Sequence, residues 1–132
     1  MYVTLQPPTA AEFKALYDQT EWANWTTEQL QKALDASWIV ASARDAEGAL
    51  VGVGRVISDG IVHAFVADLI VDERSRGEGV GAAVLDRLVT ESTDRGVTQI
   101  KLFAASGRAP FYERNQFRRR PDDAPGMDFV AA

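Results

Sequence analysis

The stretch RSRGEGVGAAV, Arg74–Val84, decides the fold of this 132-residue chain. Three glycines alternate with other residues at its centre, an apolar run precedes them, and apolar residues at helical spacing follow. A glycine-rich turn that feeds a helix leaves backbone N–H groups unpaired at the positive end of the helix dipole, with no side chains in the way. The stretch therefore predicts either a phosphate-binding loop or a flexible connector.

The segments on either side of this loop predict a βαβ unit. Ile61–Val71 is apolar at odd and even positions apart from two polar residues, as expected of a strand that is covered on both faces. Apolar residues recur at helical spacing from Val80, Gly96 marks the end of that helix, and Val97–Ala104 has the pattern of a second strand. The two strands should therefore lie parallel.

The rest of the chain predicts short helices and antiparallel strands. The pair Thr26 and Gln29 matches a capping box at the start of a helix. The predicted elements are a helix at 9–19, a helix from 26 to about 36, a hairpin of 38–43 and 49–57 around a turn at 45–48, a short helix within 109–117 that leads into a strand, and a last strand near 127–130.

Length and composition favour one globular domain, residues 1–132, because 46% of the residues are hydrophobic and the chain is too short for two independent cores. There is no cysteine and a single His63, so a histidine-rich metal site is excluded and no metal is expected. No segment has the apolar length of a membrane span, and the first residues lack the pattern of a signal peptide. We therefore expect a cytoplasmic protein that does not bind membranes.

The net charge of −5 argues against nucleic-acid binding, which relies on a basic surface. Residues 1–60 hold four Lys/Arg and eight Asp/Glu, a net charge of −4, whereas residues 61–132 hold ten and eleven, a net charge of −1. The first half of the chain is therefore the acidic one.

Two nucleotide-binding motifs do not fit the glycine loop. The P-loop requires Lys followed by Ser or Thr after its last glycine, and Gly81 is followed by two alanines. The dinucleotide fingerprint is met only nominally, by Gly77, Gly79 and Ala82. It also requires an acidic residue at the end of the next strand, which Lys101–Ala104 does not supply.

The segment Arg76–Gly81, after a buried strand that ends at Val71, resembles the R-x-x-G-x-G pyrophosphate loop of the GNAT acyltransferase superfamily. The later segment APFYERNQF, Ala109–Phe117, is similar to that family's second signature, a short helix that carries Phe-Tyr ahead of a strand. The order of the other predicted elements also agrees, so the resemblance covers essentially the whole chain. The sequence departs from the pattern at Glu73, where the family usually has Pro, and at Gln116, where it usually has Gly. We expect Asn115 to take the left-handed conformation in place of that glycine.

The resemblance implies an α/β fold with a mixed, mostly antiparallel central sheet, a splayed pair of parallel strands and flanking helices. It also implies acetyl-CoA as the acyl donor, with the loop holding its pyrophosphate beside Arg76. The pantetheine arm would bind the backbone of the strand end, and the diphosphate the N–H groups of the loop. These residues are Leu69, Ile70 and Val71 for the arm, and Gly77, Gly79, Val80, Gly81 and Ala82 for the diphosphate.

Two residues are candidates for the acid–base chemistry of acyl transfer. Tyr112 matches the family's usual proton donor to the departing thiolate, although it could instead pack beside Phe111. Asp68 interrupts an apolar strand, and a buried carboxylate is costly without a partner or a task. It is therefore either the base that accepts the amine proton or a structural hydrogen-bond acceptor for a neighbouring loop. His63 is expected to be a partly buried packing residue.

The acceptor is predicted to be a small cationic amine, because the family binds it against the first helices and strands, here the acidic half of the chain. Trp22 and Trp25 are candidate walls of its pocket or, alternatively, core residues. The predicted enzyme is an N-acetyltransferase in which the amine attacks the thioester directly. A non-catalytic acyl-CoA-binding module and an acetyltransferase of protein N-termini or lysines are the alternatives, and a homodimer is compatible with each.

Overall fold

The computed structural model describes residues 1–131 of the chain. The chain divides into two compact units, Met1–Leu102 and Phe103–Ala132. The first unit contains the whole sheet and three of the helices, and the second contains one short helix and the C-terminal segment. One domain over residues 1–132 stays a prediction.

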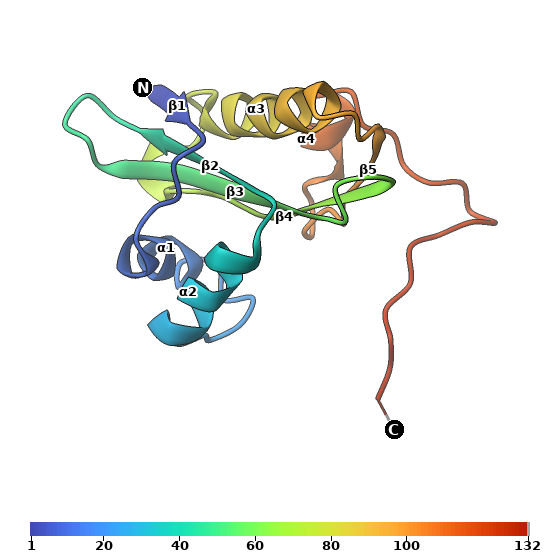
Figure 1. Ribbon diagram of the computed structural model, residues 1–132, viewed down its shortest axis with the longest axis horizontal. Helices are drawn as coiled ribbons and strands as arrows, with labels where there is room; N and C mark the ends of the chain where they lie inside the picture. Colours follow the sequence, from blue (N-terminus) through green and yellow to red (C-terminus); the bar gives the residue numbers. More distant parts are fainter. Residues whose placement is uncertain (132) are drawn as a thin grey trace. The chain divides into compact units, whose positions relative to one another are not determined.

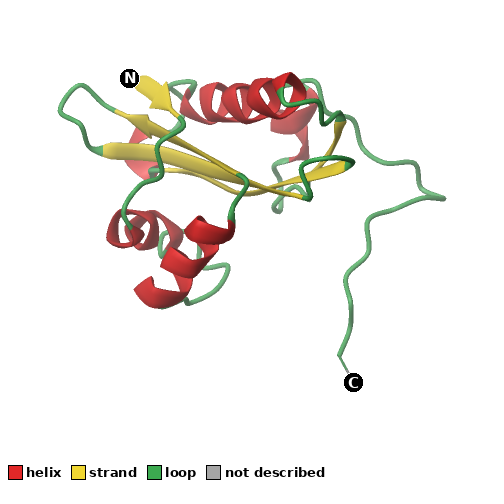
Figure 2. Cartoon of the chain, in the orientation of Figure 1, coloured by secondary structure: helices red, strands yellow, loops and turns green. Residues whose placement is uncertain are grey.

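The first unit is built around a five-stranded mixed sheet, shown as yellow arrows in Figure 2. Its strands lie in sequence order and every neighbouring pair is antiparallel except β4 and β5, which are parallel. This arrangement confirms the predicted fold class. The strands are β1 (Tyr2–Thr4), β2 (Ile39–Arg44), β3 (Leu50–Ser58), β4 (His63–Val71) and β5 (Gln99–Lys101).

Helices cover both faces of this sheet. Helices α1 (Ala10–Tyr17) and α2 (Thr27–Ala36) lie on one face, and α3 (Val80–Asp94) lies on the other (Figure 1). Both early helices begin at threonine capping boxes, with Thr9 paired to Glu12 and Thr26 to Gln29, so the predicted helix starts are confirmed.

A continuous apolar core lies between the sheet and the helices α1 and α2. Phe13 and Leu16 of α1 pack with Leu34 of α2 and with Val53 and Ile70 of the sheet, and all five side chains are buried. An ion pair at the edge of this core fixes α1 to β2, because Arg44 Nη1 lies 2.7 Å from Glu12 Oε2. Hydrogen bonds from Arg44 and from the backbone of Thr9 lower the pKa of Glu12 to about 2.

Helix α3 packs against the opposite face of the sheet, over two glycines of β3. A Cβ added to Gly52 would lie 2.6 Å from Val80 Cγ1, and one added to Gly54 would lie 2.8 Å from Leu88 Cδ1. Both α3 side chains are buried. Glycine at these two positions therefore lets the helix, including its first turn at Val80, lie directly on the sheet.

We expect Gly52→Val to lower the free energy of unfolding of the first unit by about 1–3 kcal/mol, the usual cost of overpacking a core. Urea denaturation measures this loss. Ala49→Val is a suitable control because Ala49 is exposed beside the hairpin turn. Equal stability of the Gly52→Val variant and the parent would contradict the close packing of β3 against α3.

The second unit is simpler than the sequence predicts. Helix α4 (Ala109–Glu113) is present, but the strands expected after it and near Met127–Val130 are wrong, because no residue described after Lys101 is in a strand. Met127 and Phe129 are 81% and 92% exposed, so this segment has no buried face that would fix it as a strand. Val97–Ala104 is likewise shorter than predicted, with only Gln99–Lys101 in β5.

Candidate functional site

The glycine loop, residues 76–82, joins β4 to α3 through a short 3-10 turn, Glu73–Ser75. Gly77 and Gly79 both have φ of +81°, a left-handed conformation that favours glycine. A Cβ added to either glycine would meet no atom of the described chain within 4 Å. The loop backbone is therefore open to a ligand on its outer side.

The start of α3 leaves donors available in this loop. Gly79 is the N-cap, and no side chain of residues 1–131 caps the helix there. The first N–H groups of a 15-residue helix therefore point outward at its positive end, which suits an anion. Arg76 is exposed beside them, whereas Arg74 pairs with Asp72 at 3.5 Å. The predicted donor-binding residues thus lie together, and the pyrophosphate role stays a proposal.

The parallel strands β4 and β5 separate soon after they begin. Among the described residues, β5 pairs only with His63–Phe65, while β4 continues to Val71. The backbone of β4 from residue 66 onward, including Leu69, Ile70 and Val71, therefore has no strand partner on its β5 side within the described chain. A single 3-10 turn separates this unpaired edge from the glycine loop, and the edge agrees with the splayed strand pair that the resemblance implies.

Asp68 lies at a bulge in β4. The register against β3 changes between Val53 and Arg55, and Asp68 has φ of +54°. Non-glycine residues in this conformation are uncommon, and the surrounding contacts have to hold them there. Those contacts are an ion pair from Arg55 Nε to Oδ2 at 2.6 Å and a hydrogen bond from the Tyr17 hydroxyl to Oδ1 at 3.0 Å.

Sequence reasoning missed both partners of Asp68. Arg55 gives a signal, since it is the one charged residue of strand β3. In the structure only 16% of its side chain is exposed. Tyr17 gives none, because it is 51 residues away and its spacing is that of a core residue. Burial and the Asp68 charge raise the pKa of the Tyr17 hydroxyl, so it remains a donor at neutral pH.

The two candidate acceptor tryptophans lie on the connection between α1 and α2. Trp22 is 50% exposed and Trp25 is 41% exposed, so neither is a core residue. The Trp22 ring meets the Tyr17 ring edge-on at 6.0 Å. Trp22 therefore contacts the same tyrosine that donates a hydrogen bond to Asp68.

His63 is exposed at the start of β4, so the expectation of a partly buried packing residue is wrong. The exposure follows from its position beside the turn that joins β3 and β4.

Tyr112 lies in α4 of the second unit and is half-buried. Its ring meets Phe111 at 5.0 Å and Phe117 at 6.0 Å, both edge-on. Burial raises the pKa of the Tyr112 hydroxyl, so the phenol stays protonated at neutral pH. These contacts are compatible with a proton donor held in place by aromatic packing.

The residue after Asn115 takes the left-handed conformation that usually falls to glycine. Gln116 has φ of +72°, whereas Asn115 does not have a positive φ, so the prediction for Asn115 is wrong. The Asn115 side-chain amide instead donates to the Phe111 carbonyl oxygen at 2.8 Å, and its backbone N–H bonds to the Tyr112 carbonyl oxygen. Asn115 thereby continues the hydrogen bonding at the end of α4, and Gln116 takes the left-handed conformation.

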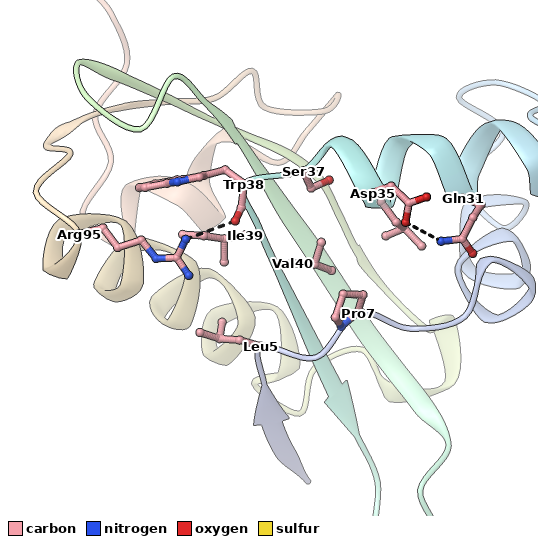
Figure 3. Close-up of a pocket in the computed structure, with 10 residues that line it drawn as sticks. Leu5, Pro7, Gln31, Asp35, Ser37, Trp38, Ile39, Val40 and Arg95 are labelled. Atoms are coloured by element: carbon pink, nitrogen blue, oxygen red, sulfur yellow. Dashed lines mark hydrogen bonds between the residues drawn. The ribbon is translucent and has the colours of Figure 1, made fainter.

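A pocket of about 300 Å³ lies at the N-terminal end of β2 (Figure 3). This end of the sheet is opposite the one from which β4 leads to the glycine loop, because Ile39 pairs with Val56 of β3 and Val71 pairs with Gly52. The pocket's polar rim residues already have partners: Asp35 accepts from Gln31 at 2.9 Å, and Arg95 pairs with Glu91 at 3.0 Å and contacts the Trp38 ring. The pocket contains none of the predicted site residues. We therefore place the candidate site at the glycine loop and β4 instead.

Comparison with known proteins defines the class to which this fold and loop belong. Residues 35–119 match the model of the acetyltransferase (GNAT) domain. The chain is 36% identical over 105 residues to serotonin N-acetyltransferase 2, chloroplastic, of Oryza sativa, covering 77% of this chain and 52% of the relative. It is 32% identical over 126 residues to histone acetyltransferase TAP1 of Glycine max, covering 88% and 54%. The crystal structure of SA2161 from Staphylococcus aureus superposes with a TM-score of 0.87 at 22% identity, covering 98% of each chain, and supports the fold.

The chain therefore belongs to the GNAT acetyltransferase family, as the sequence resemblance implied. Acetyl-CoA-dependent N-acetyl transfer is the activity class of that family. The chain spans about half the length of the curated relatives it matches. Among residues 1–131, no helix is both long and apolar enough to cross a membrane, and no group of three acidic or histidine side chains is placed to hold a metal ion.

Proposed function

We propose that this chain is an N-acetyltransferase that transfers the acetyl group of acetyl-CoA to the primary amine of a small cationic acceptor, by direct attack of the amine on the thioester. One observation carries the proposal: an open glycine loop at the start of α3 follows the unpaired backbone edge of β4 after a single 3-10 turn. A long, phosphorylated donor needs both features, because its diphosphate requires N–H donors and its amide-containing arm requires a free strand edge.

The residues available for acetyl-CoA fit that donor. The N–H groups of Gly77, Gly79, Val80, Gly81 and Ala82 would hold the diphosphate, with Arg76 supplying a positive charge. The backbone of Leu69, Ile70 and Val71 would bind the pantetheine arm. Acetyl-CoA, when bound, supplies the thioester that is attacked.

Asp68 and Tyr112 are the proposed proton-transfer residues. Asp68 takes the proton of the acceptor ammonium, directly or through water, since its side chain is 15% exposed and water can reach it. Tyr112 gives a proton to the departing thiolate, and its raised pKa supports this role because the phenol stays protonated at neutral pH. The separation of acid and base between two residues matches the two proton movements of acyl transfer.

The acceptor is proposed to bind along the connection between α1 and α2. Trp22 and Trp25 offer exposed aromatic rings, which attract an ammonium group through cation–π contact. The net charge of −4 over residues 1–60 adds attraction for a cation. The name of the rice relative, a serotonin N-acetyltransferase, agrees with a small amine. Because that relative is named as chloroplastic, the cytoplasmic location of this chain stays a prediction. A homodimer also stays a prediction.

Protein acetylation is the second candidate function, because the soybean relative is named a histone acetyltransferase. The decisive experiment is a thiol-release assay with acetyl-CoA and a panel of tryptamine, serotonin, spermidine, free lysine and lysine-containing peptides. We expect turnover with one class of small amine. Turnover confined to the peptides would favour the protein acetyltransferase, and acetyl-CoA binding without thiol release for any amine would favour the non-catalytic module.

Asp68→Asn is expected to lower turnover at pH 7 by about 10²-fold or more, the range of a positioned base. The substitution keeps the shape of the side chain and one of its two acceptor oxygens, and it removes the charge. Activity should recover partly at higher pH, where more of the acceptor is already deprotonated. The measurement is the pH profile of turnover per folded molecule.

Glu12→Gln is the matched control for this variant. It also converts an arginine-paired carboxylate to an amide in the first unit, but the Glu12–Arg44 pair joins α1 to β2 and takes no proposed part in the reaction. We expect it to lower the thermal midpoint while turnover stays at the parent level. If Asp68→Asn behaves in the same way, Asp68 is a structural acceptor and not the base.

A further inference from the structure

The Asp68 carboxylate is held by groups from three elements that are distant in sequence. Tyr17 comes from the last turn of α1, Arg55 from β3, and Asp68 itself from the bulge of β4. The Arg55–Asp68 ion pair is 84% to 85% removed from solvent on both sides, and its 2.6 Å contact is short for a charge-assisted hydrogen bond. These two donors bind both carboxylate oxygens of Asp68, whose backbone has the left-handed φ that is uncommon in non-glycine residues.

Arg55 is in turn anchored from a fourth element. Its Nη1 contacts the Ser37 hydroxyl at 3.3 Å and the Ala33 carbonyl oxygen at 3.5 Å, at the C-terminal end of α2. The Ser37 hydroxyl donates to the same Ala33 carbonyl oxygen at 2.7 Å. The guanidinium therefore has its Nε directed at Asp68 while its outer nitrogen is fixed by α2. A lysine would keep the charge but not this two-sided contact.

Tyr17 extends the contacts toward the solvent side of the same face. Its hydroxyl donates to Asp68, while its ring contacts the ring of Trp22. The connection that carries the two tryptophans is itself fixed, since Lys14 Nζ donates to the Trp25 carbonyl oxygen at 2.8 Å and pairs with Asp18 at 3.2 Å. The proposed acceptor surface and Asp68 thus share one set of contacts through a single side chain.

We propose that Tyr17 and Arg55 are positioning residues for the transfer reaction. They hold the Asp68 carboxylate at the β4 bulge in the position from which it can accept a proton from an amine bound at the acceptor surface formed by Trp22 and Trp25. This inference rests on the proposed function, in which Asp68 receives the acceptor proton. A base is effective only when it lies within hydrogen-bond reach of the proton it accepts, and a displacement of about 1 Å can cost about 100-fold in rate. The phenol and the guanidinium act on turnover through Asp68, to which both donate hydrogen bonds.

The test compares Tyr17→Phe and Arg55→Lys with two matched controls, Tyr2→Phe and Arg44→Lys. The controls make the same chemical changes on β1 and β2, at an exposed phenol and at the arginine of the Glu12 pair. We expect kcat to fall by about 10-fold to 100-fold in the two test variants. The Kd of acetyl-CoA, measured by calorimetry, should change by less than about twofold, since the loop and the β4 edge are untouched. The controls should retain the parent kcat.

A double substitution separates positioning from general stability. In an Asp68→Asn background, adding Tyr17→Phe should lower kcat little further, because both changes remove the same function. Additive losses in kcat, or parent-level kcat in folded Tyr17→Phe and Arg55→Lys, would overturn the positioning role. A parent protein that releases no thiol with any amine would instead overturn the proposed function, so the two failures are distinguishable.

Discussion

Tyr112→Phe is expected to lower turnover by about 10²-fold to 10⁴-fold, the range attributed to a positioned general acid. The substitution removes one hydroxyl and keeps the ring, so the edge-on contacts with Phe111 and Phe117 should persist. Acetyl-CoA affinity should therefore change little. The measurements are kcat from thiol release and Kd from calorimetry, made on the same preparations.

The pH dependence of this loss gives a second readout. Burial raises the pKa of Tyr112, so the phenol stays protonated through neutral and mildly alkaline pH. Solvent becomes a poorer proton source over the same range. The ratio of parent to variant turnover should therefore grow as the pH rises from 6 to about 9, below the ordinary phenol pKa of ~10. A variant within about threefold of the parent at every pH would show that Tyr112 is a packing residue and that water protonates the thiolate.

Gly79→Val is expected to weaken acetyl-CoA binding by about 100-fold or more. The new side chain would occupy the open space in front of the loop, and the loss of two charge-assisted hydrogen bonds corresponds to about 3–6 kcal/mol. Because Gly79 has φ of +81°, valine also strains the backbone and lowers stability. Calorimetric titration with coenzyme A measures the first effect and thermal unfolding the second.

Gly48→Val is a close match for the backbone cost alone. Gly48 has φ of +85°, and a Cβ there would also meet no atom of the described chain within 4 Å, but it lies in the turn between β2 and β3. The two variants should lose similar stability, and only Gly79→Val should lose affinity. Parent-like affinity in folded Gly79→Val would place the diphosphate elsewhere.

The sequence by itself determined several features of this protein that depend on short-range contacts or on the order of the elements. The capping box of Thr26 and Gln29 joins residues three apart, so it is readable from spacing, and the structure confirms it. The parallel pairing of β4 and β5 follows from the strand–loop–helix–strand order, and the structure confirms it. Each of these features depends on contacts within a short stretch of chain or on connectivity.

The tertiary structure decided the features that depend on which distant side chains meet. Sequence showed a lone carboxylate at Asp68, but not the partners Tyr17 and Arg55, which are 51 and 13 residues away. The aromatic pattern did not reveal that Trp22 and Trp25 are exposed. The apolar residues near Met127 did not reveal that no strand forms there. Burial and strand pairing are properties of the whole arrangement of elements, since a side chain is covered and a strand is paired only by another part of the chain. Spacing along the sequence does not contain that information.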